Sequence, residues 1–246
     1  MTTILHDAAD YYTRMVENGD PRTDPWFLVY SPLPIFVLFV LYVLLCVYGP
    51  RVMEKRQPFN LKTIIIPYNF ALVGLSAYMF YEILVTAWLS GYSLKCQPVD
   101  YSTNYLPMRV FFIMRKKSNQ VTFLHVYHHC TMIINWWLGV KYVAGGQPFF
   151  LAMLNSFIHT VMYLYYGMAA IGPHMQKYLW WKRYLTSMQL MQFVAILTHT
   201  IVNFFSDCDF PQGFNIAVMA YMVSLIILFG NFYYQEYVKR ARQKKK

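Results

Sequence analysis

The chain has 246 residues, of which 57% are hydrophobic and only 13% charged, and its formal net charge is +10 at pH 7. So apolar a composition excludes an ordinary soluble domain and indicates a membrane protein. The positive charge does not indicate a nucleic-acid partner, because Lys and Arg gather in the short segments between apolar runs and in the C-terminal tail, as the positive-inside rule predicts.

The N-terminal segment, residues 1–26, is polar and acidic and has no apolar centre, so it predicts a luminal arm and no cleavable signal peptide. Six apolar runs follow, and each is near or above the ~20 residues that a helix needs to cross the hydrocarbon. The short alternating segments of a β-barrel do not occur. The sequence therefore predicts an all-α polytopic membrane protein, with one transmembrane domain over residues 27–237 and a basic cytosolic tail over 238–246. The runs are 27–48, 64–89, 121–143, 148–170, 184–205 and 212–234.

Four basic clusters fall outside these runs, and the positive-inside rule assigns all of them to the cytosol. They lie at 51–62, 115–117, 177–183 and 239–246. This assignment requires the chain to recross the membrane between Lys95 and Arg115, where the only apolar stretch is ten residues long and contains a Pro and an Arg. Either an irregular segment makes this crossing or the chain lacks one helix, and the charge pattern favours the missing helix.

The third run carries three histidines, His125, His128 and His129, close behind Gln120. On a helix, His125 lies one turn from both of the others, so the three imidazoles occupy neighbouring faces. Ionisable side chains at membrane depth are costly, and they normally face the bundle interior at a functional site.

The later runs carry polar residues at helical spacing. Asn155 and His159 are one turn apart, and Thr186, Gln189 and Gln192 follow each other at intervals of three. Singly, such residues often join transmembrane helices by hydrogen bonds. Together, on three successive runs and each near a basic end, they indicate one functional site.

At these motifs the sequence resembles the elongases of very long-chain fatty acids, which are membrane enzymes of the endoplasmic reticulum. The resemblance extends over about residues 24–237 and rests on several motifs in order. These are Gln120-x-x-x-x-His125-x-x-His128-His129, Asn155-x-x-x-His159-x-x-Met162-Tyr163-x-Tyr165-Tyr166, Thr186-x-x-Gln189-x-x-Gln192, and two flanking basic segments, residues 111–117 and 177–182.

The resemblance implies seven transmembrane helices, six of them around a narrow tunnel closed at its luminal end. The family's third helix carries a Lys-x-x-Glu-x-x-Asp-Thr motif, which is absent here because Arg109 runs directly into Val110. About six full spans are therefore readable in this chain. The missing piece is the crossing that the charge pattern also requires.

The resemblance implies condensation of a long-chain acyl-CoA with malonyl-CoA to a 3-oxoacyl-CoA two carbons longer, with release of CO₂ and CoA. A neutral imidazole can accept the acyl group, and hydrogen-bond donors can stabilise the enolate that decarboxylation leaves. The family pattern points to His128 and His159 as the reacting pair, with His128 favoured as acyl acceptor. His125 and His129 would shape the site.

The same family pattern implies a path for CoA and the thioester. Cations would bind the phosphates, and amides and hydroxyls would bind the pantetheine. No cofactor is expected besides the two CoA substrates, and the expected partners are the lipid bilayer and other elongases or enzymes of the elongation cycle. The path residues are Arg115, Lys117, Gln120, His125, Asn155, Tyr165, Lys182, Thr186 and Gln189.

Two alternatives remain open at this point. Histidine boxes also occur in membrane di-iron desaturases and hydroxylases, but those sites need several boxes and this chain has one, so no metal is expected. A catalytically impaired family member is the other alternative, because an open tunnel wall would expose polar groups to lipid.

Cys96 and Cys208 follow the luminal ends of two runs in the seven-crossing topology, with the C-terminus in the cytosol. The resemblance suggests that they form a disulfide, which the oxidising lumen permits. If the missing helix inverted everything downstream, the two cysteines would lie on opposite sides and would not pair.

Overall fold

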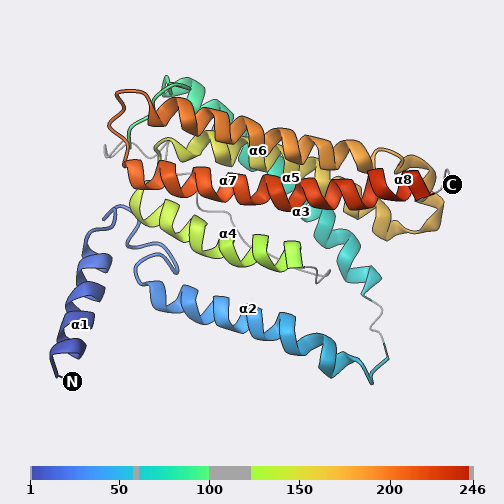
Figure 1. Ribbon diagram of the computed structural model, residues 1–246, viewed down its shortest axis with the longest axis horizontal. Helices are drawn as coiled ribbons and strands as arrows, with labels where there is room; N and C mark the ends of the chain where they lie inside the picture. Colours follow the sequence, from blue (N-terminus) through green and yellow to red (C-terminus); the bar gives the residue numbers. More distant parts are fainter. Residues whose placement is uncertain (1, 58–60, 100–122, 244–246) are drawn as a thin grey trace. The chain divides into compact units, whose positions relative to one another are not determined.

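The computed structural model of the chain describes residues 2–57, 61–99 and 123–243 (Figure 1). Within these ranges every regular element is helical, which confirms the predicted all-α class. Five of the described helical stretches are long and apolar enough to cross a membrane, which confirms the polytopic prediction. They are α2 (Pro32–Met53), α3 (Lys62–Leu89), α5 (Pro148–Ile171), α6 (Lys182–Phe204) and the continuous stretch Gln212–Gln243, which comprises α7 (Gln212–Tyr233), the π-helix η3 (Tyr234–Lys239) and α8 (Arg240–Gln243).

The remaining predicted run, residues 121–143, forms α4 (Phe123–Tyr142), a helix of 20 residues. It is long enough to span the hydrocarbon but does not reach the apolarity of the other five. The reason is its content of polar side chains, which include the three histidines, Asn135 and Lys141. The predicted helix is therefore present, and several polar side chains lie along it. The predicted gap, where Arg109 runs directly into Val110 in place of the family's third helix, falls on residues 100–122, outside the described part of the chain.

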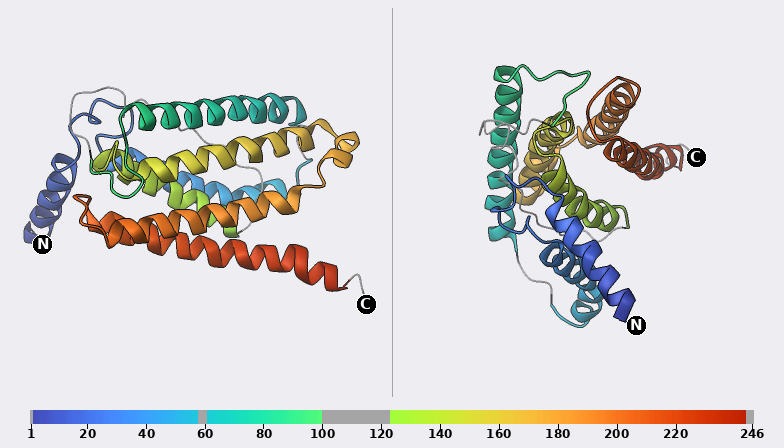
Figure 2. Two further views of the ribbon diagram at one scale, coloured as in Figure 1. Left: turned by 90° about the horizontal axis from the view of Figure 1, so that it is seen from above. Right: turned by 90° about the vertical axis from the view of Figure 1, so that its left-hand side faces the viewer.

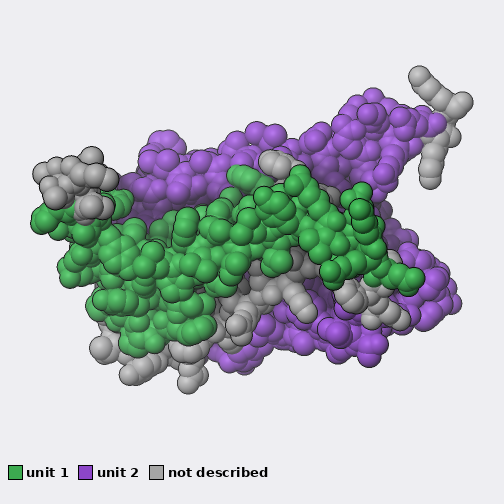
Figure 3. All heavy atoms as spheres, turned by 90° about the horizontal axis from the view of Figure 1, so that it is seen from below, with its two compact units in different colours: residues 1–58, 115–145 green, residues 59–114, 146–246 purple. Residues whose placement is uncertain are grey.

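The chain forms two compact units, coloured separately in Figure 3. Unit 1 comprises Met1–Pro58 and Arg115–Gly145, and unit 2 comprises Phe59–Met114 and Gly146–Lys246. In unit 1, α2 packs against α4, and α1 (Thr2–Glu17) runs across the direction of α2 (Figure 1). Helix α2 begins where Ser31 accepts a hydrogen bond from the Leu33 amide at 3.2 Å, and Pro32 occupies the first turn, where its missing N–H has no cost.

In unit 2, α5 packs against both α3 and α6, and α6 packs against α7 (Figure 2). Helices α3 and α5 approach closely at Gly167, where an added Cβ would lie 3.2 Å from the Phe70 ring. A small residue at such a crossing lets two membrane helices make extensive van der Waals contact. Between α5 and α6 the chain forms a short 3₁₀ helix, η2 (Pro173–Tyr178).

Buried amides connect α6, α7 and the segment after α3 in unit 2. Asn203 and Asn215 are 0% and 2% exposed. The Asn215 amide donates to Asn203 Oδ1 at 2.8 Å, and the Asn203 amide donates to the Lys95 carbonyl oxygen at 3.3 Å. Both amides are buried, and a buried polar group without a hydrogen-bond partner is costly, so each of these groups depends on its partner.

Asn203→Ala is therefore expected to lower the free energy of unfolding by about 1–3 kcal/mol, because it leaves the buried Asn215 amide without the Asn203 oxygen. Equilibrium unfolding in detergent measures the loss. Asn231→Ala is the matched control, since Asn231 is an exposed asparagine in α7. Equal effects of the two substitutions would contradict the stabilising role of the buried pair.

The segment after α3 is also joined covalently to the connection between α6 and α7. Cys96 and Cys208 form a disulfide across 112 residues of sequence. Next to it, the Gln97 backbone N–H donates to Gln147 Oε1 at 2.8 Å, and the Gln147 amide lies 3.1 Å from His199 Nε2. One end of unit 2 is thus held by a disulfide and by side-chain hydrogen bonds.

Candidate active site

Helix α4 of unit 1 positions the histidine motif. The His128 and His129 rings lie edge to face, with centroids 5.5 Å apart, and both side chains are partly buried. His125 lies in the same helix one turn before them, which the 3.6-residue period requires. The side chain of His125 and the whole of Arg115, Lys117 and Gln120 lie outside the described residues.

Tyr42 contacts one ring of this motif, and Thr131 contacts its backbone. The Tyr42 ring of α2 lies 6.4 Å from the His129 ring, between centroids. The Thr131 hydroxyl lies 2.8 Å from the Tyr127 carbonyl oxygen and 3.0 Å from the His128 carbonyl oxygen, to which it donates. Threonine hydroxyls make this bond within a helix when the surroundings offer no better acceptor. The imidazoles are therefore presented by a helix that is packed on one side against α2.

Helix α5 of unit 2 positions the second motif. Asn155 and His159 are both partly buried, and the His159 ring meets the Tyr163 ring edge to face at 5.6 Å between centroids. Tyr165 is 9% exposed and packs edge to face against Trp181 at 5.1 Å. It belongs to a buried cluster with Leu179 and Leu185, so its ring anchors the α5–α6 connection.

The third motif, Thr186, Gln189 and Gln192, lies on the face of α6 that packs inside unit 2. Thr186 and Gln192 are each 5% exposed. The Gln189 amide donates to Met162 Sδ of α5 at 3.7 Å, and the Thr186 hydroxyl lies 3.3 Å from the Tyr237 hydroxyl. The spacing of three therefore places the motif on a buried face, as predicted for residues that share one side of a helix.

The beginning of α6 is cationic and meets the end of the α7 stretch. Lys182 Nζ lies 3.8 Å from Glu236 Oε1, and Glu236 also pairs with Arg240 at 2.6 Å. The Tyr237 hydroxyl donates to the Lys182 carbonyl oxygen at 3.4 Å. Because the Lys182 side chain is half exposed, its ion pair is screened by water and leaves the ammonium accessible to an anion.

Sequence reasoning did not include Tyr233, Glu236 and Tyr237 in the site. Tyr233 accepts a hydrogen bond from Arg183 Nε at 2.7 Å, and the other two contact Lys182 and Thr186. These residues lie at or within η3, a π-helical turn of the kind often found at functional sites. Hydropathy and motif spacing do not reveal a π-turn, so no sequence signal pointed to them.

The candidate residues are thus divided between the units. His128 and His129 belong to unit 1, whereas His159, Tyr165, Lys182, Thr186 and Gln189 belong to unit 2. Within the described part of the chain, no three His, Cys, Asp or Glu side chains come together as a metal site requires. The chemistry that these side chains offer is nucleophilic or basic imidazole, hydroxyl and amide donors, and cations for an anionic group.

Comparison with known proteins supplies the context. The model of the ELO family, described as the GNS1/SUR4 family, matches residues 27–245. Very long chain fatty acid elongase 4 of Homo sapiens is 45% identical over 263 residues, which cover 99% of this chain and 84% of that protein. Very long chain fatty acid elongase 7 of Rattus norvegicus is 43% identical over 254 residues, covering 94% and 90%. Very long chain fatty acid elongase 2 of Mus musculus is 43% identical over 252 residues, covering 95% and 86%.

The length of one alignment bears on the predicted missing segment. The 263 aligned positions of the human relative exceed the 246 residues of this chain by 17. At least 17 residues of that relative therefore have no counterpart here. Seventeen residues are near the lower limit of the length of a membrane-spanning helix.

Proposed function

The chain belongs to the GNS1/SUR4 (ELO) family, and from this premise we propose that it is a fatty acid elongation enzyme that condenses a long-chain acyl-CoA with malonyl-CoA. The observation that carries the proposal is the family match over residues 27–245, together with 45% identity to a very long chain fatty acid elongase over almost the whole chain. Both histidine motifs fall within the matched region.

In the first step, a ring nitrogen of His128 attacks the thioester carbonyl carbon of the acyl-CoA. A carbon–nitrogen bond forms, the carbon–sulfur bond breaks, and CoA leaves with the proton that the imidazole gives up. The partial burial of His128 supports this role, because a partly desolvated neutral imidazole is a competent nucleophile. His129 and Tyr42 would hold the reacting helix face in place.

In the second step, malonyl-CoA loses CO₂, and the electron pair of the broken carbon–carbon bond forms an enolate. The enolate carbon attacks the acyl carbonyl, the bond to His128 breaks, and the imidazole takes up a proton. The product is a 3-oxoacyl-CoA two carbons longer, with one proton consumed overall. His159 would donate a hydrogen bond to the developing enolate oxygen, where such a donor has its greatest effect.

The cationic beginning of α6 supports an assignment for the CoA moiety. Lys182, with its half-exposed ammonium, would bind phosphate, and Thr186 and Gln189 would follow along the pantetheine. Arg115, Lys117 and Gln120 would complete this path. We place the enzyme in the membrane of the endoplasmic reticulum, with its N-terminus in the lumen and its C-terminus in the cytosol. In that membrane it would associate with other elongation enzymes.

The test is an assay of purified protein with labelled malonyl-CoA and a long-chain acyl-CoA. The expected product is a labelled 3-oxoacyl-CoA two carbons longer, formed only when both substrates are present. Metal analysis of the same preparation is the control for the di-iron alternative. Absence of product together with about two bound iron atoms per chain would overturn the proposal.

A catalytically impaired family member is the second candidate, and the 17 or more residues of the human relative that have no counterpart in this chain favour it. The discriminating experiment inserts the family's third helix between Arg109 and Val110 and assays both forms side by side. Product from the lengthened chain alone would assign the unmodified chain a non-catalytic role. Product from both would show that the crossing is dispensable for condensation.

A further inference from the structure

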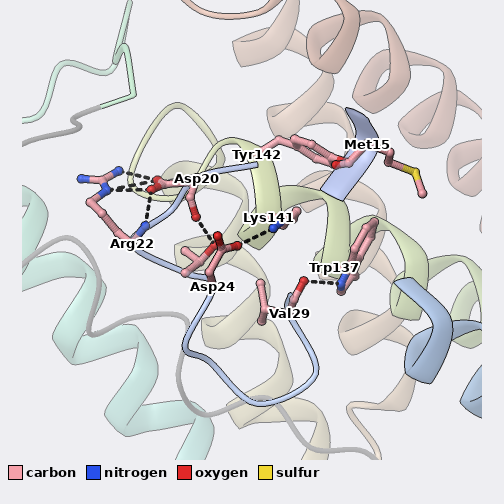
Figure 4. Close-up of polar contacts among 9 residues, drawn as sticks. Met15, Asp20, Arg22, Asp24, Val29, Trp137, Lys141 and Tyr142 are labelled. Atoms are coloured by element: carbon pink, nitrogen blue, oxygen red, sulfur yellow. Dashed lines mark hydrogen bonds and ion pairs between the residues drawn. The ribbon is translucent and has the colours of Figure 1, made fainter. Parts of the chain in front are cut away.

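A segment before the first membrane helix lies against the C-terminal end of α4 in unit 1 (Figure 4). We call residues 18–30 the N-terminal strap. The Asp20 amide donates to the Lys141 carbonyl oxygen at 2.7 Å, and Lys141 Nζ lies 2.5 Å from Asp24 Oδ1. One helical turn earlier, Trp137 Nε1 donates to the Val29 carbonyl oxygen at 3.1 Å. The strap therefore holds α4 at two heights on one helix face.

The lysine in this contact is unusual, because its side chain is 0% exposed. Lysine is almost never fully buried unless it is paired. Besides Asp24, its ammonium faces the Tyr30 ring at 5.3 Å. The Asp24 side chain is one third exposed, so only the lysine side of the pair is buried, and it is the Lys141 ammonium that becomes strongly unfavourable when it loses its partner.

Hydrogen bonds within the strap also fix its own conformation. The Asp20 carboxylate accepts hydrogen bonds from Arg22 at Nε and Nη2, at 3.0 and 2.6 Å, and the Asp20 carbonyl accepts one from the buried Thr23 hydroxyl at 2.9 Å. A bidentate arginine–carboxylate contact fixes geometry as well as contributing energy. Asp24 is thus presented to Lys141 from a defined turn.

Helix α1 adds a third attachment. The Tyr142 hydroxyl donates to the Met15 carbonyl oxygen at 2.7 Å, and Val16 is buried beside it. Trp137, Lys141 and Tyr142 together define both the rotation of α4 about its axis and its displacement along that axis.

The same helix carries His128, thirteen residues before Lys141, which is about 20 Å along the axis. A packed helix transmits a rotation along its length. With imidazoles roughly 6 Å from the axis, a rotation of about 20° moves them by about 2 Å. A misplacement of about 1 Å at a reacting group can reduce a rate about a hundredfold.

We propose that the Asp24–Lys141 ion pair is a positioning device that sets the rotation and depth of α4 and thereby presents His128 and His129 for reaction. The proposal rests on the proposed function for its kinetic consequence, but not for its structural consequence. Lys141 and Asp24 are positioning residues and touch no substrate.

The variants that test it are Lys141→Met, Asp24→Asn and the double variant, with Arg14→Met as the matched control. Arg14 is exposed in the same unit, so its substitution removes one positive charge away from the strap contacts. Asp24→Asn leaves the fully buried Lys141 ammonium without its carboxylate and is expected to reduce the yield of folded protein strongly, whereas Lys141→Met leaves only the one-third-exposed Asp24 carboxylate and is expected to reduce it less. The double variant removes both charges and is expected to regain that yield.

The decisive measurement is kcat of the folded double variant. We expect it to remain at least tenfold below the parent, with KM for malonyl-CoA changed less than twofold, because α4 is folded but no longer held in register. A double variant with parental kcat would overturn the proposal and leave the ion pair a purely structural role.

Gly19→Ala provides an independent variant. A Cβ on Gly19 would collide with the end of the Lys141 side chain and displace its ammonium, although both charges stay in the protein. The expected fall in kcat has the same direction as that of the double variant. Parental kcat in this variant would contradict the proposal, because it would show that the position of the Lys141 ammonium does not affect the reaction.

Cys130 supplies a readout that requires no activity. It follows His129 directly, is 8% exposed and does not belong to the disulfide. In a Cys46→Ser background, we expect a maleimide to alkylate Cys130 at least tenfold faster in the double variant than in the parent, because α4 has rotated. His128→Ala, in contrast, is expected to abolish product without changing this rate. If the parent makes no product, the proposed function fails, while unchanged alkylation in the double variant would overturn the positioning proposal.

Discussion

Replacing His128 with alanine is expected to reduce the rate of condensation by roughly a thousandfold or more, which corresponds to about 4 kcal/mol of lost transition-state stabilisation. The reason is chemical, because alanine offers no atom to accept the acyl group from CoA. In the parent, acyl-CoA alone should release up to one CoA per chain before malonyl-CoA is added. The variant should release none.

The measurement combines a rapid-quench thiol assay for CoA with the labelled-product assay. His174→Ala is the matched control, since His174 is an exposed histidine outside the three motifs. His159→Ala is expected to keep the initial release of CoA and lose the condensation step. Release of CoA by His128→Ala, but not by His159→Ala, would exchange the two roles. Parental product formation by both variants would refute the assignment to this pair.

Loss of the Cys96–Cys208 disulfide is expected to have the largest effect on stability. The bond closes a sequence separation of 112 residues and so restricts the unfolded chain strongly. Either Cys→Ser substitution should lower the free energy of unfolding by about 2–4 kcal/mol. For a protein of this length, that loss lowers the unfolding temperature by roughly 5–15 °C.

Thermal unfolding in detergent measures this effect, and a mobility difference between reduced and non-reduced gels reports the bond. The two single variants and the double variant should be equally destabilised, because each removes the same bond. Cys46→Ser is the control, since Cys46 is a free thiol. Reaction of parental Cys208 with a thiol reagent confined to the cytosol would contradict both the bond and the luminal placement.

The membrane helices were predictable because their cause is local. A run of about 20 apolar residues is unstable in water and can satisfy its backbone in lipid only as a helix. The predicted run 184–205 therefore corresponds closely to α6, Lys182–Phe204. The predicted run 121–143 likewise corresponds to α4, Phe123–Tyr142, although its polar side chains, among them His125, His128 and His129, keep it out of the group of five most apolar stretches.

The candidate residues were predictable as a set of motifs, since their order along the chain carries the family resemblance. The residues that contact them in the fold were not predictable. Tyr237 meets Thr186 across 51 residues, and Asp24 meets Lys141 across 117, and neither contact has a periodic pattern in the sequence. The fully buried lysine illustrates the difficulty, because its sequence position at the end of an apolar run favours a solvated side chain.

By itself, the sequence determined the helical class, the membrane environment, the family and which histidines belong to its motifs, because hydropathy and motif spacing are properties of short stretches. The tertiary structure alone decided which partner each buried polar group has. In an apolar interior a charge or an amide must find a specific partner wherever the fold supplies one. Lys141 finds it in the N-terminal strap and Asn203 finds it in α7, and this pairing of distant segments is the physical basis for the proposed positioning of α4.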